Sequence, residues 1–209
     1  LRAELFERVP EAVLGSLALL DVPRAWALRA RWVELRGGPA RAAGTYPRAR
    51  ALARAVTGLD NPEAWKLRKL ARDAAPVAAL TSLRGITSDK AWIWRERAVG
   101  RAPKAVLGTV AGMDDPRAWA LRAGTALRCR EALDSMIGLD HPAAWEIREA
   151  CLEIWPPSVI KSLGVLVNGA RGQNLLERAL AGFSDQISLL KQAAIIATGS
   201  SLQRSVMAA

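Results

Sequence analysis

Few residues of this chain have the types and spacing that catalysis or metal binding needs. The single histidine, His141, lies between an aspartate and a proline, a turn position where a side chain more often caps a helix than acts as a base. The two cysteines, Cys129 and Cys151, fall in expected helices, and we interpret both as reduced, packed thiols. The carboxylates of residues 146–153 have a helix-surface spacing. The sequence therefore predicts no enzyme activity, no cofactor and no metal site.

Tryptophan and arginine, in contrast, recur together along the chain. The motif Asp-x-Pro-x-Ala-Trp-x-Leu-Arg is clearest at Asp114–Arg122 and returns with variations elsewhere. Its tryptophans, 39, 27, 27 and 26 residues apart, are Trp26, Trp65, Trp92, Trp119 and Trp145. The arginines three positions later are Arg29, Arg68, Arg95, Arg122 and Arg148. A recurring spacing of this length predicts a repeat architecture.

Both residue types have a structural and a binding interpretation. On a helical wheel the arginine falls inside the apolar arc formed by the tryptophan and the leucine, and a buried arginine needs a partner. We expect the arginines to bond the motif's aspartates or the helix-end carbonyls of adjacent repeats, forming a structural ladder. The alternative is a row of arginines that lines a groove for an acidic ligand. One tryptophan per repeat likewise predicts a repeated core, although tryptophan can also stack on nucleic-acid bases.

Each repeat has the pattern of two helices. Asp-x-Pro opens the first, because the aspartate or the next residue can cap free N–H groups and proline fits the first turn. The second carries apolar residues at helical spacing, as in Pro103, Val106, Leu107 and Val110. Glycine ends the second helix at Gly58, Gly85, Gly112 and Gly138. The prediction is an all-α fold, an α-solenoid of stacked helical hairpins of 26–27 residues, with no β-sheet.

The repeat pattern also predicts how the chain is organised. We expect one helical-repeat array over residues 1–198, with a loop insertion at about 37–47 that accounts for the longest tryptophan spacing. The motif fades after Gly164, and two closing helices are expected at about 174–197. Residues 199–209 are small and polar, as in a mobile tail.

Charge is unevenly distributed along the chain. The formal net charge is +10, and residues 1–104 carry 20 Lys and Arg against 10 Asp and Glu. A basic half of this kind fits an acidic partner, which includes nucleic acid. It fits equally a GC-rich genome that uses arginine where others use lysine. The solvent-side candidates for binding such a partner are Arg31, Lys66, Lys69, Arg97 and Arg101. No apolar run reaches the roughly 18 residues that span a bilayer and no signal-peptide pattern is present, so we expect a cytoplasmic protein without a membrane partner.

The motifs at Asp114–Arg122 and Ala102–Leu107 resemble those of HEAT-like short helical repeats over about residues 5–165. The segments Trp155–Gly164 and Ile187–Lys191 are similar to the end of repeat regions that follow a thymidylate-kinase-like P-loop domain in some bacterial proteins. This resemblance implies a non-catalytic piece of a larger nucleotide-handling protein. No kinase residue is carried over, because the phosphate-binding loop motif is absent from these residues.

Three functional hypotheses follow from these patterns. The leading one is a non-catalytic helical-repeat scaffold that binds a protein partner or a neighbouring domain of a larger protein. The alternative is a nucleic-acid-binding HEAT-like module that uses the basic N-terminal half. The third is a segment that regulates or assembles an enzyme to which it belongs.

Overall fold

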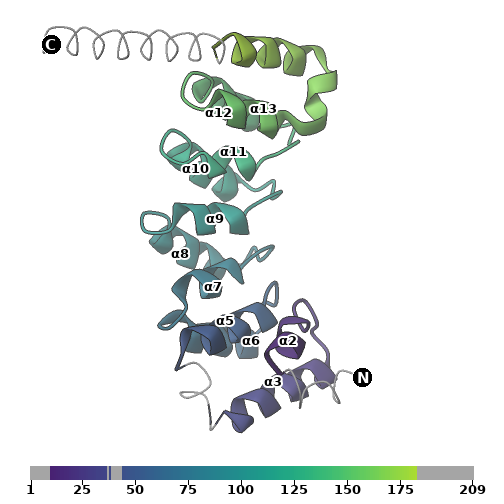
Figure 1. Ribbon diagram of the computed structural model, residues 1–209, viewed down its shortest axis with the longest axis vertical. Helices are drawn as coiled ribbons and strands as arrows, with labels where there is room; N and C mark the ends of the chain where they lie inside the picture. Colours follow the sequence, from purple (N-terminus) through teal and green to yellow (C-terminus); the bar gives the residue numbers. More distant parts are fainter. Residues whose placement is uncertain (1–9, 37, 39–43, 183–209) are drawn as a thin grey trace, which may run out of the picture. The chain divides into compact units, whose positions relative to one another are not determined.

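The computed structural model describes residues 10–36, 38 and 44–182. Every regular element in these ranges is a helix, which confirms the predicted all-α class (Figure 1). The helices are α2 (Pro10–Gly15), α3 (Pro23–Leu35), α5 (Tyr46–Ala55), α6 (Pro62–Arg72), α7 (Pro76–Thr81), α8 (Asp89–Ala98), α9 (Pro103–Thr109), α10 (Pro116–Thr125), α11 (Glu131–Asp134), α12 (Pro142–Ala150), α13 (Pro156–Leu163) and the 3₁₀ helix η1 (Gly164–Asn168). Residues 170–182 are also helical. No helix in the described ranges has the length and apolar character needed to cross a membrane.

Proline and a polar side chain start many of these helices. Proline occupies the first turn of α3, α6, α7, α9, α12 and α13, where its missing N–H costs no hydrogen bond. The Asn61 side chain accepts a hydrogen bond from the Ala64 N–H of α6 at 2.9 Å. In α12 the His141 side chain accepts from the Ala143 N–H at 3.2 Å. In both helices the residue after the motif's aspartate is therefore the N-cap, which leaves the aspartate for another partner.

Glycine in the left-handed backbone region ends the second helix of several repeats. The φ angles are 74° for Gly58, 77° for Gly85, 74° for Gly112 and 71° for Gly138, and an L-residue pays about 1–2 kcal/mol for this conformation. The N–H of Gly58 donates to the carbonyl of Ser82, and that of Gly138 to the carbonyl of Ser162, both at 3.0 Å. The turns at Gly58 and Gly138 are thereby joined to the second helix of the next repeat.

Leu19 has the same left-handed conformation without being a glycine, with a φ of 64°. Its side chain is 69% exposed, so it buries little apolar surface that could offset the strain of this backbone conformation. We expect Leu19→Gly to raise the free energy of unfolding by about 1 kcal/mol, because glycine adopts this backbone conformation without strain. The greater conformational entropy of the unfolded glycine chain offsets part of this gain. Urea unfolding of the full chain measures this change.

Gly85→Ala is the reciprocal control for Leu19→Gly. Nothing lies within 4 Å of a Cβ added at Gly85, so its expected loss of about 1 kcal/mol comes from the backbone alone. A Leu19→Gly chain that unfolds at lower urea concentration than the unchanged chain would contradict the prediction.

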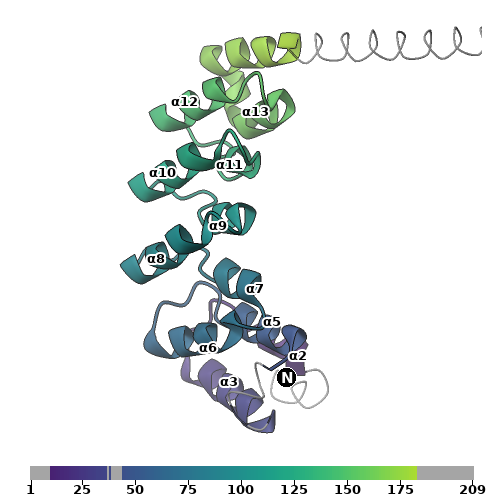
Figure 2. The ribbon, with the colours of Figure 1, turned by 90° about the vertical axis from the view of Figure 1, so that its left-hand side faces the viewer.

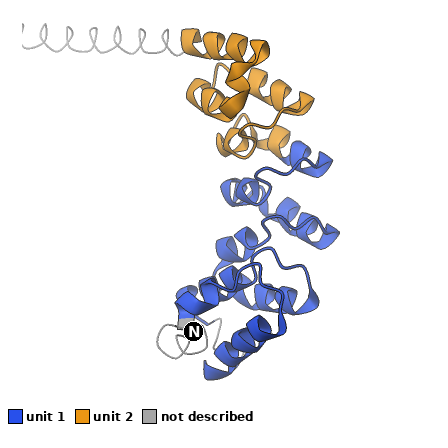
Figure 3. Ribbon diagram, turned by 90° about the vertical axis from the view of Figure 1, so that its right-hand side faces the viewer, with its two compact units in different colours: residues 1–121 blue, residues 122–209 orange. Residues whose placement is uncertain are grey.

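The chain forms two compact units, residues 1–121 and 122–209, with the boundary inside α10 (Figure 3). In the first unit α2 packs on α5, α5 on α7 and α7 on α9. Figure 2 shows α6 and α8 on one side of this unit and α7 and α9 on the other. In the second unit α11 packs on α13, and α13 on η1. Each unit buries apolar side chains of its own, such as Leu52 and Leu83 in the first and Leu133 and Val159 in the second.

The structure shifts two of the expected boundaries. The inserted loop expected at about 37–47 ends before residue 46, because Tyr46 and Pro47 already form the first turn of α5. The first closing helix, expected from residue 174, begins at residue 170. The remainder of the closing helices to residue 197 and the tail at 199–209 lie outside the described residues.

Candidate functional site

The arginines of the repeated motif are buried, and four of them bond to both neighbouring second helices, namely Arg29, Arg68, Arg95 and Arg148. Nη2 of Arg68 donates to the carbonyls of Val56 at 2.6 Å and Leu59 at 2.7 Å, and Nε donates to Oγ of Ser82 at 2.9 Å. These acceptors lie 12 and 9 residues before the arginine and 14 residues after it. We call this arrangement an arginine clasp. It joins the turn before the first helix of a repeat to the second helix after it.

The clasp recurs in the other repeats with small variations. Arg148 donates to the carbonyls of Met136 and Leu139 and to Oγ of Ser162, all at 3.1 Å. Arg95 donates to the carbonyl of Leu83 and to Oγ1 of Thr109, both at 2.8 Å, and Arg122 donates to Oγ of Ser135 at 3.0 Å. Arg29 donates to the carbonyls of Leu17, Leu20 and Ala55. A serine or threonine hydroxyl therefore supplies the forward acceptor in four of these five clasps.

The motif's tryptophans lie beside the arginines and donate hydrogen bonds to the motif's aspartates. The indole N–H of Trp65 donates to Asp60 at 2.7 Å, and the Arg68 guanidinium lies 4.8 Å from the centre of the Trp65 ring. Trp26, Trp119 and Trp145 donate in the same way to the aspartates five residues before them. The expected arginine–aspartate bond is thus replaced by a tryptophan–aspartate bond, because the indole N–H is the group that reaches the carboxylate. The arginine uses the helix-end carbonyls, which was the other expected partner.

Burial places the tryptophans in the interior and perturbs the arginines. Trp65, Trp92, Trp119 and Trp145 are at most 7% exposed, and Trp26 is half-buried. Burial lowers the pKa of Arg68, Arg95 and Arg148 to about 10, and the nearby aspartates Asp60, Asp115 and Asp140 offset part of that effect. These arginines remain charged at neutral pH, which strengthens their hydrogen bonds. The polar contacts described above for Arg68 and Arg148 are with buried or partly buried groups of the chain itself, so these clasps hold neighbouring helices together.

The first unit also has a groove lined mostly by exposed or partly exposed residues, between α6 and α7 on one side and α8 on the other. Its volume is about 590 Å³. Its lining residues are Arg72, Pro76, Val77, Leu80, Trp94, Arg97, Ala98, Arg101 and Ala102. Trp94 packs T-shaped against Trp65, with ring centres 5.5 Å apart, and the Arg72 guanidinium lies 5.9 Å from the Trp94 ring centre. We call this feature the α6–α8 groove.

The α6–α8 groove is strongly basic. Three arginines line it and no carboxylate is among its lining residues. Arg72 pairs with Asp73 at 3.3 Å, and both side chains are largely exposed. Within the described residues Arg97 and Arg101 are exposed and form no ion pair. Three guanidinium groups around an apolar floor can bind a ligand that is both acidic and apolar.

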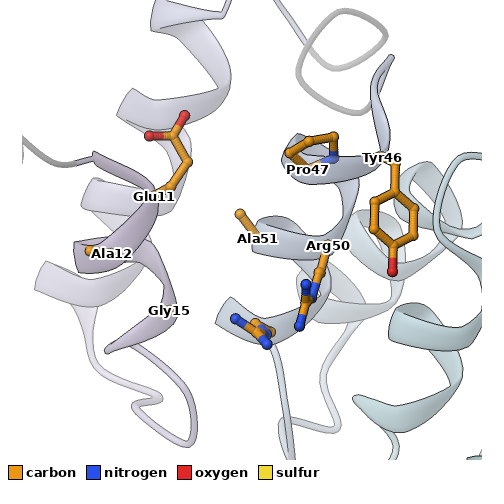
Figure 4. Close-up of a pocket in the computed structure, with 8 residues that line it drawn as sticks. Glu11, Ala12, Gly15, Tyr46, Pro47, Arg50 and Ala51 are labelled. Carbon is orange, nitrogen blue, oxygen red and sulfur yellow. The ribbon is translucent and has the colours of Figure 1, made fainter.

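A second pocket lies between α2 and α5 and differs in charge (Figure 4). Its volume is about 400 Å³, and Arg50, Arg54 and Tyr46 line its α5 side. Glu11 lines the α2 side and is bonded to Arg36. This pocket therefore contains both signs of charge and a floor of small residues, so it selects an acidic ligand less strongly than the α6–α8 groove.

The structure brings only some of the predicted cationic residues together. All five candidates, Arg31, Lys66, Lys69, Arg97 and Arg101, are exposed. Arg97 and Arg101 line the α6–α8 groove, whereas Lys66 pairs with Glu63 at 2.8 Å. Arg72 and Trp94 also line the groove, although the sequence patterns did not predict them as binding residues. One signal was available: Trp94 stands where the repeats at Trp65 and Trp119 have Leu67 and Leu121.

The residues that suggested chemistry have structural partners. His141 caps α12, as described above. Cys129 donates to Glu131 at 3.1 Å, and burial raises the pKa of the Cys151 thiol. Among the described residues, no group of three or more histidine, cysteine, aspartate and glutamate side chains is placed to hold a metal ion.

Comparisons with protein-family models, with curated proteins and with solved structures found no match for this chain. The resemblance to HEAT-like repeats therefore remains a prediction from the motifs. The functional inference depends on the residues and geometry of the chain itself.

Proposed function

We propose that this chain is a non-catalytic helical-repeat scaffold, an α-solenoid of stacked hairpins, that binds a protein partner or a neighbouring domain of a larger protein. The recurring arginine clasps support the stacking, because each joins one repeat to the next at equivalent positions. Repeats that contact mainly their neighbours expose long surfaces that serve binding. A thymidylate-kinase-like P-loop domain is one candidate neighbour, on the strength of the motif resemblance alone.

The observation that carries the proposal is the α6–α8 groove. It combines a partly buried tryptophan with arginines that no lining carboxylate neutralises. Interface cores are enriched in tryptophan and arginine, which often dominate binding energy. The clasps hold both walls of the groove through residues that the ligand does not need to touch. A partner that supplies negative charge can therefore bind without rearrangement of the fold.

Site-specific photo-crosslinking in cells tests the proposal. A photoreactive amino acid replaces Val77, which lines the groove and is 52% exposed. We expect it to capture a specific protein, and Arg97→Glu/Arg101→Glu to abolish that capture.

The matched control is Arg50→Glu/Arg54→Glu, an exposed pair on α5 with the same spacing and the same change of charge. This control is expected to retain the captured protein. Capture of no specific protein, or equal capture by both double variants, would remove the support for a protein-binding scaffold at this groove.

A further inference from the structure

The chemistry of the α6–α8 groove identifies a class of ligand, and this inference rests on the binding function proposed above. We propose that the groove binds a short peptide segment of a partner protein in which one large apolar side chain lies between carboxylate side chains. The apolar residue enters the floor of the groove, and the carboxylates bond the arginines on its two walls.

The floor of the groove is the apolar part of the site. Val77 is 52% exposed, and Trp94 is only partly buried although it contacts Trp65. Pro76, Ala98 and Ala102 complete an apolar lining. Such a surface gains most from a partner side chain that removes it from water. A ligand that carries only charged groups would leave this apolar surface exposed to water.

The positive charges lie on both walls of the groove. Arg72 is the last residue of α6, whereas Arg97 and Arg101 lie at the end of α8 and just beyond it. The one ion pair among them, from Arg72 to the 85%-exposed Asp73, is a weak surface pair that a ligand carboxylate can replace. Guanidinium groups bind carboxylates through paired hydrogen bonds. Cations on two sides of an apolar floor match carboxylates on two sides of an apolar residue.

A peptide fits these residues better than single-stranded nucleic acid. Base stacking needs an open aromatic face, yet Trp94 already contacts Trp65 and has the Arg72 guanidinium 5.9 Å from its ring centre. A nucleic-acid backbone also needs a continuous track of cations. The predicted cations are not assembled into one here, since Lys66 is paired with Glu63.

Fluorescence anisotropy with the full chain tests the ligand class. The probe is a fluorescein-labelled peptide with a central phenylalanine between pairs of aspartates. Three comparison probes are the same peptide with glycine for phenylalanine, the same peptide with asparagine for aspartate, and labelled oligothymidylate. We expect saturable binding of the first probe and affinities weaker by at least about tenfold for each of the other three.

Protein variants locate the binding on the chain. Arg97→Glu/Arg101→Glu is expected to weaken binding of the first probe by at least about tenfold, and Arg50→Glu/Arg54→Glu by less than about twofold. Trp94→Leu is expected to weaken it while the helical circular dichroism is kept, because Leu67 and Leu121 occupy this motif position in other repeats.

Three results overturn the inference: no binding of the acidic phenylalanine peptide, binding that both double variants retain equally, or tighter binding of oligothymidylate that depends on Arg97 and Arg101. If the peptide fails while Val77 still captures a protein in an Arg97- and Arg101-dependent way, the ligand class is wrong and the proposed function stands. If both experiments fail, the proposed function at this groove fails with it.

Discussion

Replacing Arg68 with methionine is expected to lower the free energy of unfolding by about 3 kcal/mol. Methionine keeps much of the apolar stem of Arg68 but supplies none of the donors that bond Val56, Leu59 and Ser82. These acceptors are buried, so each loses a charged donor without gaining access to water, although the Val56 carbonyl still accepts from the Leu59 N–H. Urea unfolding of the full chain, followed by far-ultraviolet circular dichroism, measures the loss.

Two comparison variants test whether the loss of stability comes from the clasp or from the removal of a positive charge. Lys69→Met removes an exposed cation next to Arg68 and is expected to change stability by less than about 0.5 kcal/mol. Ser82→Ala removes the Nε acceptor, and its effect is expected to be smaller in the Arg68→Met background than alone. Equal losses for Arg68→Met and Lys69→Met would show that the clasp does not stabilise the fold.

Replacing Trp65 with alanine is the second change with a large expected effect, a loss of about 4 kcal/mol. Trp65 is 5% exposed and contacts three aromatic or cationic groups, namely Trp94, Arg68 and Lys90. Alanine leaves a cavity beneath the Arg68 guanidinium and removes the T-shaped contact that supports Trp94. We therefore also expect this variant to bind the acidic phenylalanine peptide more weakly, although Trp65 does not line the groove.

Trp65→Phe tests which part of the tryptophan matters. Phenylalanine keeps an aromatic ring but loses the N–H that donates to Asp60 at 2.7 Å, and about 1–2 kcal/mol is the expected cost. Trp26→Ala is the positional control, because Trp26 is only half-buried and should cost less than Trp65→Ala. The opposite order, with Trp26→Ala the more damaging, would contradict the role assigned to burial.

The helices could be predicted from the sequence because residues that start a helix and residues that end one recur in each repeat. Proline and a capping side chain such as Asn61 mark a start, and glycines such as Gly58 mark an end through a backbone angle that other residues avoid. The wheel also indicated that Arg68 lies within the apolar arc. Its hydroxyl acceptor Ser82 was not predicted, although the sequence contains a signal: Ser82, Thr109 and Ser135 each lie three residues before a glycine that ends a second helix.

The α6–α8 groove could not be predicted in the same way. Its walls come from consecutive repeats, and whether Arg72 and Arg97 face one cavity depends on how those repeats pack. Arg97 and Arg101 lie on the solvent side, outside the apolar arc or in a helix-linking turn, but so does Lys66, whose partner Glu63 is three residues away. Charge on a helix wheel shows which residues are exposed. It does not show which exposed residues share a ligand.

The similar intervals within the clasps also constrain how such a chain can change in length during evolution. Arg68 and Arg148 both take carbonyls 12 and 9 residues upstream and a hydroxyl 14 residues downstream. In the clasp of Arg122 the hydroxyl acceptor, on Ser135, lies 13 residues downstream and is still bonded at 3.0 Å. A change of one residue in the link between helices is therefore tolerated, and duplicating or losing a whole repeat would leave the remaining arginines bonded. Arg29 shows where extra residues are tolerated, because its forward carbonyl, on Ala55, is 26 residues away, beyond the inserted segment. Ancestral growth of this chain is therefore expected to have proceeded by duplication of complete repeats, with smaller insertions confined to the links between helices.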